Sequence, residues 1–128
     1  MPNLEVIARL KIRPGQLDGF KSHAAELVRL SRENDTKTLR YDWFIADDGT
    51  ECEVHEAYVS AEGLVEHNMH IMEARAVLFR DHAFDHRMSA YGEISEELRA
   101  LGQKHAGGIR EFSLLVGLEP VRVVDARP

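Results

Sequence analysis

Cysteine, basic charge and long apolar runs are all scarce in this chain of 128 residues. The single cysteine, Cys52, can form neither an internal disulfide nor a multi-cysteine metal site, and such usage is typical of a reducing cytosol. The net charge of -6, with both signs interspersed, provides no basic face for nucleic acid. No signal peptide or membrane span is predicted, because the first residues lack a basic region followed by an apolar core. We therefore expect a cytoplasmic protein without nucleic-acid or membrane partners.

Two runs rich in aromatic and β-branched residues, 39–45 and 52–58, flank the dipeptide Asp48-Gly49. Asp-Gly is a strong hairpin signal, because glycine adopts positive φ without steric cost. A two-residue turn at this point predicts the cross-strand pairs Tyr41–Glu56, Leu39–Tyr58, Trp43–Val54 and Ile45–Cys52. Side chains alternate along a strand, so these eight residues share one side of the hairpin, where Glu56 is the polar exception. We expect helices to cover this side, with one carboxylate set into it.

The remaining pattern predicts a strand over 4–12, a helix over 17–34, a second helix that Ser60 caps and that reaches Ala83, a short helix over 95–102 and a strand over 109–118. The tail, residues 120–128, either extends that last strand or crosses to a neighbour. The order β-α-β-β-α-β predicts an α+β, ferredoxin-like fold with an antiparallel sheet, in a single domain over residues 1–128. Because the helices cover one side of the sheet, we expect a homodimer to cover the other.

Three polar residues interrupt the apolar face of the second predicted helix at intervals of seven: Asn68, Arg75 and His82. They are nearly in line on the face that should cover Glu56, and an unpaired polar group there costs about 1–3 kcal/mol. Two explanations remain open. The stripe either forms hydrogen bonds to the chain or to a partner subunit, or it lines a cavity between helix and sheet.

Two histidine pairs have spacings at which a helix could present them to one metal ion: His67 with His70, and His82 with His86. By helical projection His67 lies at the edge of the apolar face and His70 outside it, so we expect this pair to be solvated. The second pair projects inward if the helix continues that far. Neither pair belongs to an HExxH motif, and we expect no metal site.

Three segments, LRYD at 39–42, VHEAY at 54–58 and SAEGLVEH at 60–67, resemble the antibiotic-biosynthesis-monooxygenase family of dimeric α+β barrels. In that family a "cLRYdl" strand is followed by "fvlyEvy", "deeal" and a helical histidine. The earlier VIARLKIRPGQLDGFKSHAAELV is also similar to the family's first strand and helix, so the likeness covers about the first 70 residues. The resemblance implies a dimeric α+β barrel that oxidises a quinol or polyphenolic aromatic compound with dioxygen, without metal, flavin or haem.

Such chemistry needs a base, donors for a developing oxyanion and a dry apolar slot, because a deprotonated phenol is electron-rich enough to reduce dioxygen itself. His82 or Glu56 is the candidate base, and Asn68 and Arg75 are the candidate oxyanion donors. The candidate substrate-binding residues are Tyr41, Trp43, Tyr58, His67 and Met72. Two other interpretations remain open: a non-catalytic dimeric module that binds a small apolar ligand, and haem binding. Haem binding usually requires a tryptophan on the second helix, whereas Trp43 lies on a predicted strand.

Overall fold

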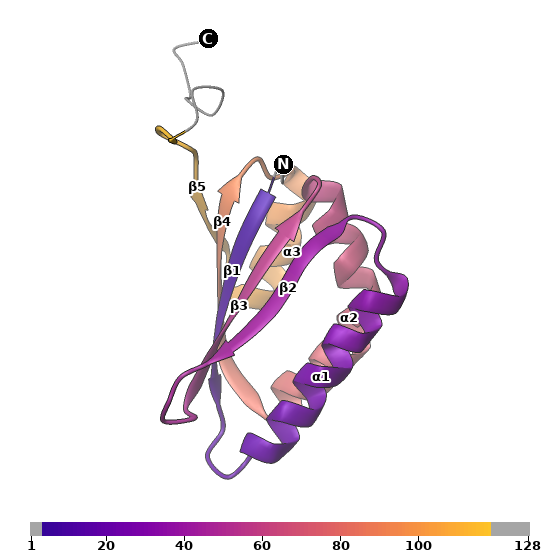
Figure 1. Cartoon of the computed structure of the whole chain (residues 1–128), viewed down its shortest axis with the longest axis vertical. Helices are drawn as coiled ribbons and strands as arrows, with labels where there is room; N and C mark the ends of the chain where they lie inside the picture. Colours follow the sequence, from indigo (N-terminus) through magenta and orange to yellow (C-terminus); the bar gives the residue numbers. More distant parts are fainter. Residues whose placement is uncertain (1–3, 119–128) are drawn as a thin grey trace.

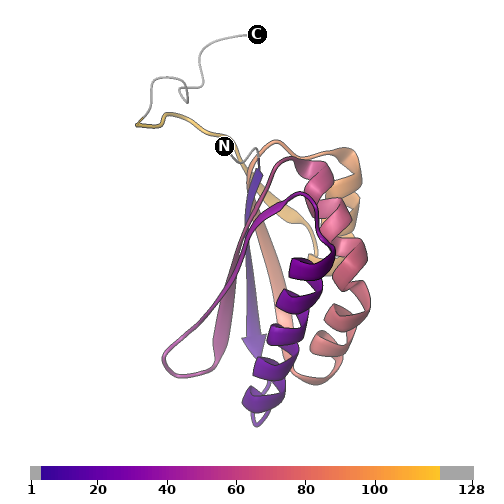
Figure 2. The ribbon, with the colours of Figure 1, turned by 45° about the vertical axis from the view of Figure 1, so that its right-hand side comes forward.

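Within residues 4–118, the part of the chain that the computed structural model describes, a five-stranded sheet is covered on one face by three helices (Figures 1 and 2). The strands lie in the order β2-β3-β1-β4-β5. In chain order the elements are β1 (Leu4–Ile12), α1 (Leu17–Asn34), β2 (Thr38–Ile45), β3 (Glu51–Tyr58), α2 (Ala61–Asp81), β4 (Ala83–Gly92), α3 (Glu96–Ala106) and β5 (Ile109–Phe112). The predicted α+β, ferredoxin-like fold is confirmed.

The central strand β1 shows why this sheet has one buried face. It pairs antiparallel with β3 on one side and with β4 on the other. Its side chains alternate, and those on the helix side are buried: Leu4, Val6, Ala8, Leu10 and Ile12. The amphipathic helices α1 and α2 pack Leu27 and Ile71 against that face, so α2 lies directly over the middle of the sheet.

The hairpin of β2 and β3 has the predicted register over most of its length. Tyr41 pairs with Glu56, Trp43 with Val54 and Ile45 with Cys52. The prediction for Leu39 was wrong, because a register shift between Thr38 and Arg40 lets Thr38 pair with Tyr58 instead and leaves Leu39 56% exposed. The turn has the expected left-handed Gly49, with φ of 72°.

The largest error of the sequence prediction concerns the chain after α2. The helix ends at Asp81, and residues 83–92, which were not predicted as a strand, form β4 beside β1. Alternation is broken there, because the pairing with β1 shifts between Arg9 and Lys11 and because Asp85 has a φ of 55°. A strand pattern is therefore hard to recognise in AFDHRMSAYG.

The last described elements also differ from the prediction. Helix α3 begins at the predicted Ser95 cap, whose side chain accepts a hydrogen bond from Leu98 N at 3.1 Å, but it continues to Ala106 instead of ending at Gly102. Strand β5 ends at Phe112, short of the predicted 118, and it pairs with β4 in parallel. The sheet is therefore mixed, and the prediction of an antiparallel sheet was wrong. The predicted role of the tail at 120–128 falls outside the described residues.

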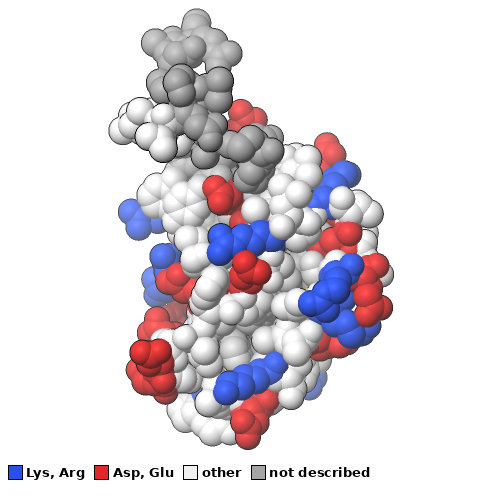
Figure 3. Space-filling model, viewed as in Figure 1, with Lys and Arg blue, Asp and Glu red and all other residues white. Residues whose placement is uncertain are grey.

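The molecular surface carries charges of both signs, interspersed over the face that Figure 3 shows. On the sheet face opposite the helices Phe44 is 48% exposed. None of the helices in residues 4–118 is long and apolar enough to cross a membrane. The homodimer that would cover the open sheet face stays a prediction.

Candidate active site

A cavity of about 50 Å³ lies between the sheet and α2. Its walls are mainly apolar and include Leu10, Val54, Leu64, Ile71 and Leu78. The polar or aromatic side chains that line it are Tyr41, Trp43, Glu56, His67, Arg75, Phe79 and His86. This volume holds a few waters or a molecule the size of dioxygen, whereas a cavity of about 150 Å³ is needed for benzene. An aromatic ring must therefore enlarge the cavity in order to enter it.

His67 is the polar group at the centre of this cavity wall. Its side chain is only 2% exposed, and its Nδ1 lies 2.6 Å from Asp35 Oδ2. Because Asp35 is ionised, Nδ1 carries the proton and donates a hydrogen bond to the carboxylate. The other nitrogen, Nε2, is buried and has no hydrogen-bond partner among the described residues. The prediction that His67 would be solvated was wrong, since helical projection does not show a buried partner that comes from another element.

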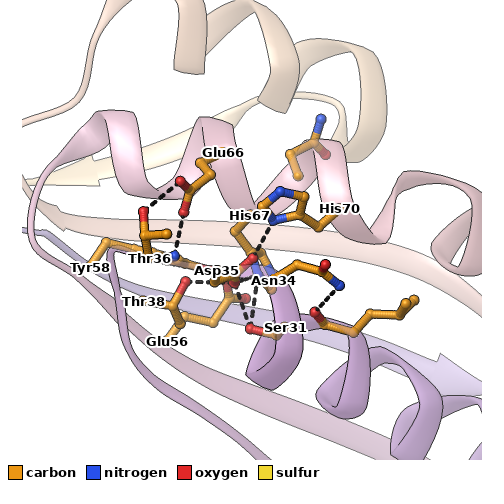
Figure 4. A network of polar contacts seen from close by, with 12 residues as sticks. Ser31, Asn34, Asp35, Thr36, Thr38, Glu56, Tyr58, Glu66, His67 and His70 are labelled. Atoms are coloured by element: carbon orange, nitrogen blue, oxygen red, sulfur yellow. Dashed lines mark hydrogen bonds and ion pairs between the residues drawn. The ribbon is translucent and has the colours of Figure 1, made fainter.

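Asp35 is well placed to orient this histidine, because the fold surrounds it with donors (Figure 4). It is the C-cap that follows the last residue of α1, and its side chain is 2% exposed. The Asp35 Oδ2 atom accepts hydrogen bonds from Ser31 Oγ at 2.5 Å and Thr38 Oγ1 at 2.7 Å, in addition to that from His67. His70 Nδ1 lies 2.6 Å from Oδ1. Burial alone would raise the pKa of Asp35, but these hydrogen bonds outweigh burial and hold it well below its usual value.

Two tyrosine rings fix the plane of the His67 imidazole. Tyr41 meets it edge-on, with ring centroids 4.4 Å apart, and Tyr58 lies against it at 5.6 Å. The arrangement resembles the acid–histidine half of a catalytic triad, in which a buried carboxylate holds one imidazole nitrogen so that the other can accept a proton. His67 therefore has the geometry of a general base, because Asp35 holds its Nδ1, its Nε2 has no partner among the described residues, and its side chain lines the cavity.

Glu56 is the buried carboxylate that the hairpin register predicted. It is 7% exposed and accepts a hydrogen bond of 2.5 Å from the Tyr58 hydroxyl. Burial raises the pKa of Glu56, while His67, Tyr58 and Arg75 act in the opposite direction. Tyr58 does not line the cavity itself, and its contact with the predicted site is this hydrogen bond.

Arg75 and Asn68 form a hydrogen-bonded pair on α2, in which Arg75 Nη1 donates to Asn68 Oδ1. Asn68 does not line the cavity, but it holds the guanidinium that does. Within residues 4–118 no carboxylate lies within ion-pair distance of Arg75, and its Nη2 is buried without a hydrogen-bond partner. Burial lowers the pKa of Arg75. The guanidinium is thus a positive charge facing the cavity without a neutralising contact.

Two predicted site residues lie elsewhere. His82 follows the last residue of α2 as its C-cap, its Nδ1 lies 3.0 Å from Gln16 Oε1, and its ring lies beside His23. It does not line the cavity. Helical spacing had placed it in line with Arg75, but the helix stops before it. Met72 is 47% exposed, because the neighbouring Ile71 is the residue that α2 turns toward the sheet.

His86 is a cavity residue that the sequence prediction did not assign to the site. It projects from β4, its ring stacks on Phe79 at 4.8 Å, and its Nδ1 lies 3.2 Å from the carbonyl oxygen of His105. Its spacing of four from His82 predicted a helical pair instead. Only recognition of β4 as a strand would have placed it opposite Arg75.

One group of described residues has the atoms that a metal ion prefers: Asp35, Glu66 and His70 place one ligand atom each within 4.8 Å of one another. Both Glu66 oxygens accept hydrogen bonds from Thr36, and one Asp35 oxygen is bound by His70. A metal ion would have to displace these contacts. Of the two histidine pairs, His67 and His70 both bind Asp35 through Nδ1, while His82 follows α2 and His86 lies on β4.

The chain is similar to proteins of known family and structure. Residues 4–70 match the protein family described as antibiotic biosynthesis monooxygenase. The structure of MupZ from Pseudomonas fluorescens is similar, with a TM-score of 0.73 and 24% identity over 95% of this chain and 98% of that one. Rv0793 from Mycobacterium tuberculosis has a TM-score of 0.62 and 23% identity, over 73% and 96% of the two chains. PA3566 from Pseudomonas aeruginosa has a TM-score of 0.63 and 17% identity, over 74% and 97%. No curated protein sequence matches the chain.

Proposed function

Because the chain belongs to the antibiotic biosynthesis monooxygenase family, we propose that it oxidises a quinol or polyphenolic aromatic compound with dioxygen. The observation that carries this proposal is the Asp35–His67 pair. It presents an oriented imidazole nitrogen, without a hydrogen-bond partner among the described residues, to a cavity with apolar walls. The reaction proposed uses no metal, flavin or haem, because the electrons come from the substrate.

The first step is proton transfer from the substrate to His67. A phenol or an activated methylene gives its proton to Nε2, and the imidazolium that forms is stabilised by the Asp35 carboxylate 2.6 Å from Nδ1. The Arg75 guanidinium stabilises the anion that remains, and its charge acts strongly where apolar walls exclude water. Glu56 is the second candidate base, but its short hydrogen bond from Tyr58 leaves it less accessible than His67.

The anion then reduces dioxygen. For an anthrone-like substrate, a methylene carbon becomes a carbonyl carbon: one oxygen atom of dioxygen forms the new C=O bond, and the other leaves as water with the two hydrogens of the methylene. The substrate supplies all four electrons that dioxygen accepts, so no external reductant is consumed. The small cavity suits dioxygen, since it is lined by Leu10, Ile71 and Leu78.

The bulk of an aromatic substrate is proposed to enter from a groove between α1 and β2. Ala24, Val28 and Arg32 line this groove on the helix side. Tyr41 and Trp43 line both the groove and the inner cavity, so these two rings form the wall between them. Rotation of one ring would join the two spaces while the reacting end of the substrate reaches His67.

Oxygen uptake with anthrone and a panel of quinols tests the proposal, with wild type compared to His67→Gln and His82→Gln. Loss of a general base lowers turnover by about 10²–10⁴-fold, so we expect that decrease for His67→Gln. His82→Gln is the matched control, because it removes a helical-end histidine outside the cavity, and we expect uptake within about twofold of wild type. Uptake by wild type no faster than by His67→Gln, for every substrate, would refute the enzymatic function.

A further inference from the structure

We propose that Arg75 and His105 form an anion-binding subsite at the α3 end of the cavity, and that the substrate carries a carboxylate which binds there. The proposal rests on the proposed function in one respect, namely that the ligand of this cavity is the substrate. All residues of the subsite lie beyond the 4–70 segment that matches the family, so it is a feature of the rest of this chain.

The first argument is that two buried side-chain nitrogens lack a hydrogen-bond partner in the described part of the chain. Arg75 Nη2 and His105 Nε2 are both buried, and neither has a hydrogen-bond partner among residues 4–118. Buried polar groups in folded proteins are nearly always hydrogen-bonded. The two residues are neighbours, because the His105 carbonyl contacts His86, which lines the cavity together with Arg75, so the two unpaired nitrogens indicate a place for a ligand. A carboxylate has two oxygen acceptors, which can pair with these two nitrogens.

The second argument is that α2, β4 and α3 contact one another beside the cavity, which His105 adjoins without lining it. Arg75 comes from α2, His86 from β4 and His105 from α3, and the carbonyl oxygen of His105 lies 3.2 Å from His86 Nδ1. Arg75 and His86 both line the cavity. The nearby Arg75 charge also lowers the pKa of both histidines, although burial is the larger cause for each. Arg75, His86 and His105 are thus three basic side chains, and Glu56 is the acidic residue that lines the same cavity.

The third argument concerns charge in the resting state. Arg75 is permanently positive, and none of the described carboxylates lies within ion-pair distance of it. Glu56 is the carboxylate whose charge raises the pKa of Arg75. It accepts a hydrogen bond from the Tyr58 hydroxyl and forms no ion pair with Arg75. A phenol is neutral near pH 7 and would leave the guanidinium uncompensated, whereas a carboxylate is ionised at that pH. The subsite thus favours an aromatic acid over a neutral phenol.

The only tryptophan of the chain, Trp43, lines the cavity and reports on its occupancy. We would titrate the protein with benzoate and with benzamide, which has a similar shape without the charge, and follow Trp43 fluorescence. The expected result is at least tenfold tighter binding of benzoate. Arg75→Gln and His105→Gln should each reduce this preference to less than threefold, as judged on variants that retain the wild-type circular dichroism spectrum.

Arg99→Gln is the matched control, because Arg99 is exposed on α3 and already paired with Glu111 at 2.9 Å, and it should keep the full preference. Equal binding of the two compounds by wild type, no binding of either, or a preference that survives both subsite substitutions would overturn the proposal. Benzoate has no oxidisable group, so this titration is independent of turnover. Oxygen uptake that depends on His67 without a benzoate preference refutes the subsite alone, and the reverse result refutes the oxygenase function alone.

Discussion

The sharpest consequence of the site is that Asp35→Asn should destabilise the fold although it changes one atom. The asparagine amide has one oxygen, which best occupies the position of Oδ2, because three donors meet there: Ser31, Thr38 and His67. Its amino group then faces His70 Nδ1. This imidazole is 30% exposed, so it can change tautomer and accept a hydrogen bond. The contacts survive the substitution, but the negative charge does not.

The magnitude follows from that difference. A hydrogen bond to a charged group contributes about 1.5–3 kcal/mol, and one between neutral groups about 0.5–1.5 kcal/mol. Three bonds that each lose about 1 kcal/mol of charge assistance lower the free energy of unfolding by about 3 kcal/mol. With the urea dependence usual for a small domain, about 1–3 kcal/mol per M, this corresponds to a fall of about 1–3 M in the urea midpoint.

Equilibrium urea unfolding at several pH values measures this effect. The pKa of Asp35 is lowered in the folded protein, so its stabilisation is fully present above the ordinary value of 3.8 and is lost as pH falls toward the folded value. The difference between wild type and Asp35→Asn should therefore be largest near neutral pH and decrease below pH 4. Asp42→Asn is the control, because Asp42 forms an exposed ion pair with Arg40 and should cost less than about 1 kcal/mol. Equal effects of the two substitutions would refute the reasoning, as would a difference that does not decrease in acid.

Two further predictions concern packing. Gly102→Ala should lower the free energy of unfolding by about 1–3 kcal/mol, because the added Cβ would lie 2.2 Å from Ile109 Cγ1. Thermal unfolding should show partial recovery in the double variant with Ile109→Ala. An unchanged Tm of Gly102→Ala would mean that α3 and β5 are not packed together as described. We also propose that the open sheet face, where Phe44 is 48% exposed, forms a homodimer, so light scattering at micromolar concentration should give twice the chain mass; a monomer would contradict it.

The parts of the fold that sequence predicts well are those governed by local pattern. The alternation of β1 and the Asp48-Gly49 turn predicted a strand boundary and three cross-strand pairs, and these placed Glu56 on the buried side of the sheet. The first 70 residues carry these regular signals. Burial of Glu56 and the presence of Arg75 in the cavity follow from the same periodicities of two and 3.6 residues.

The rest of the site depends on contacts that no local pattern contains. Asp35 and His67 are 32 residues apart and meet only because α1 ends beside the second turn of α2. His86 was misplaced because the positive φ of Asp85 and the register shift beside it disrupt the alternation of β4. A helix projection also assigns each residue to a face without knowing where the helix stops, which is why His82 was predicted to lie in the site.

Strand β5 pairs with β4 in parallel, unlike the antiparallel pairs in the rest of the described sheet. Two parallel neighbours need a crossover between them, and here α3 is that crossover, which places the His105 carbonyl beside His86. The Asp35–His67 pair is built by α1 and α2 and makes no hydrogen bond to this crossover. In the site that we propose, changes in α3 would therefore alter which molecules bind while the Asp35–His67 pair stays intact, so ligand selection and chemistry would evolve separately.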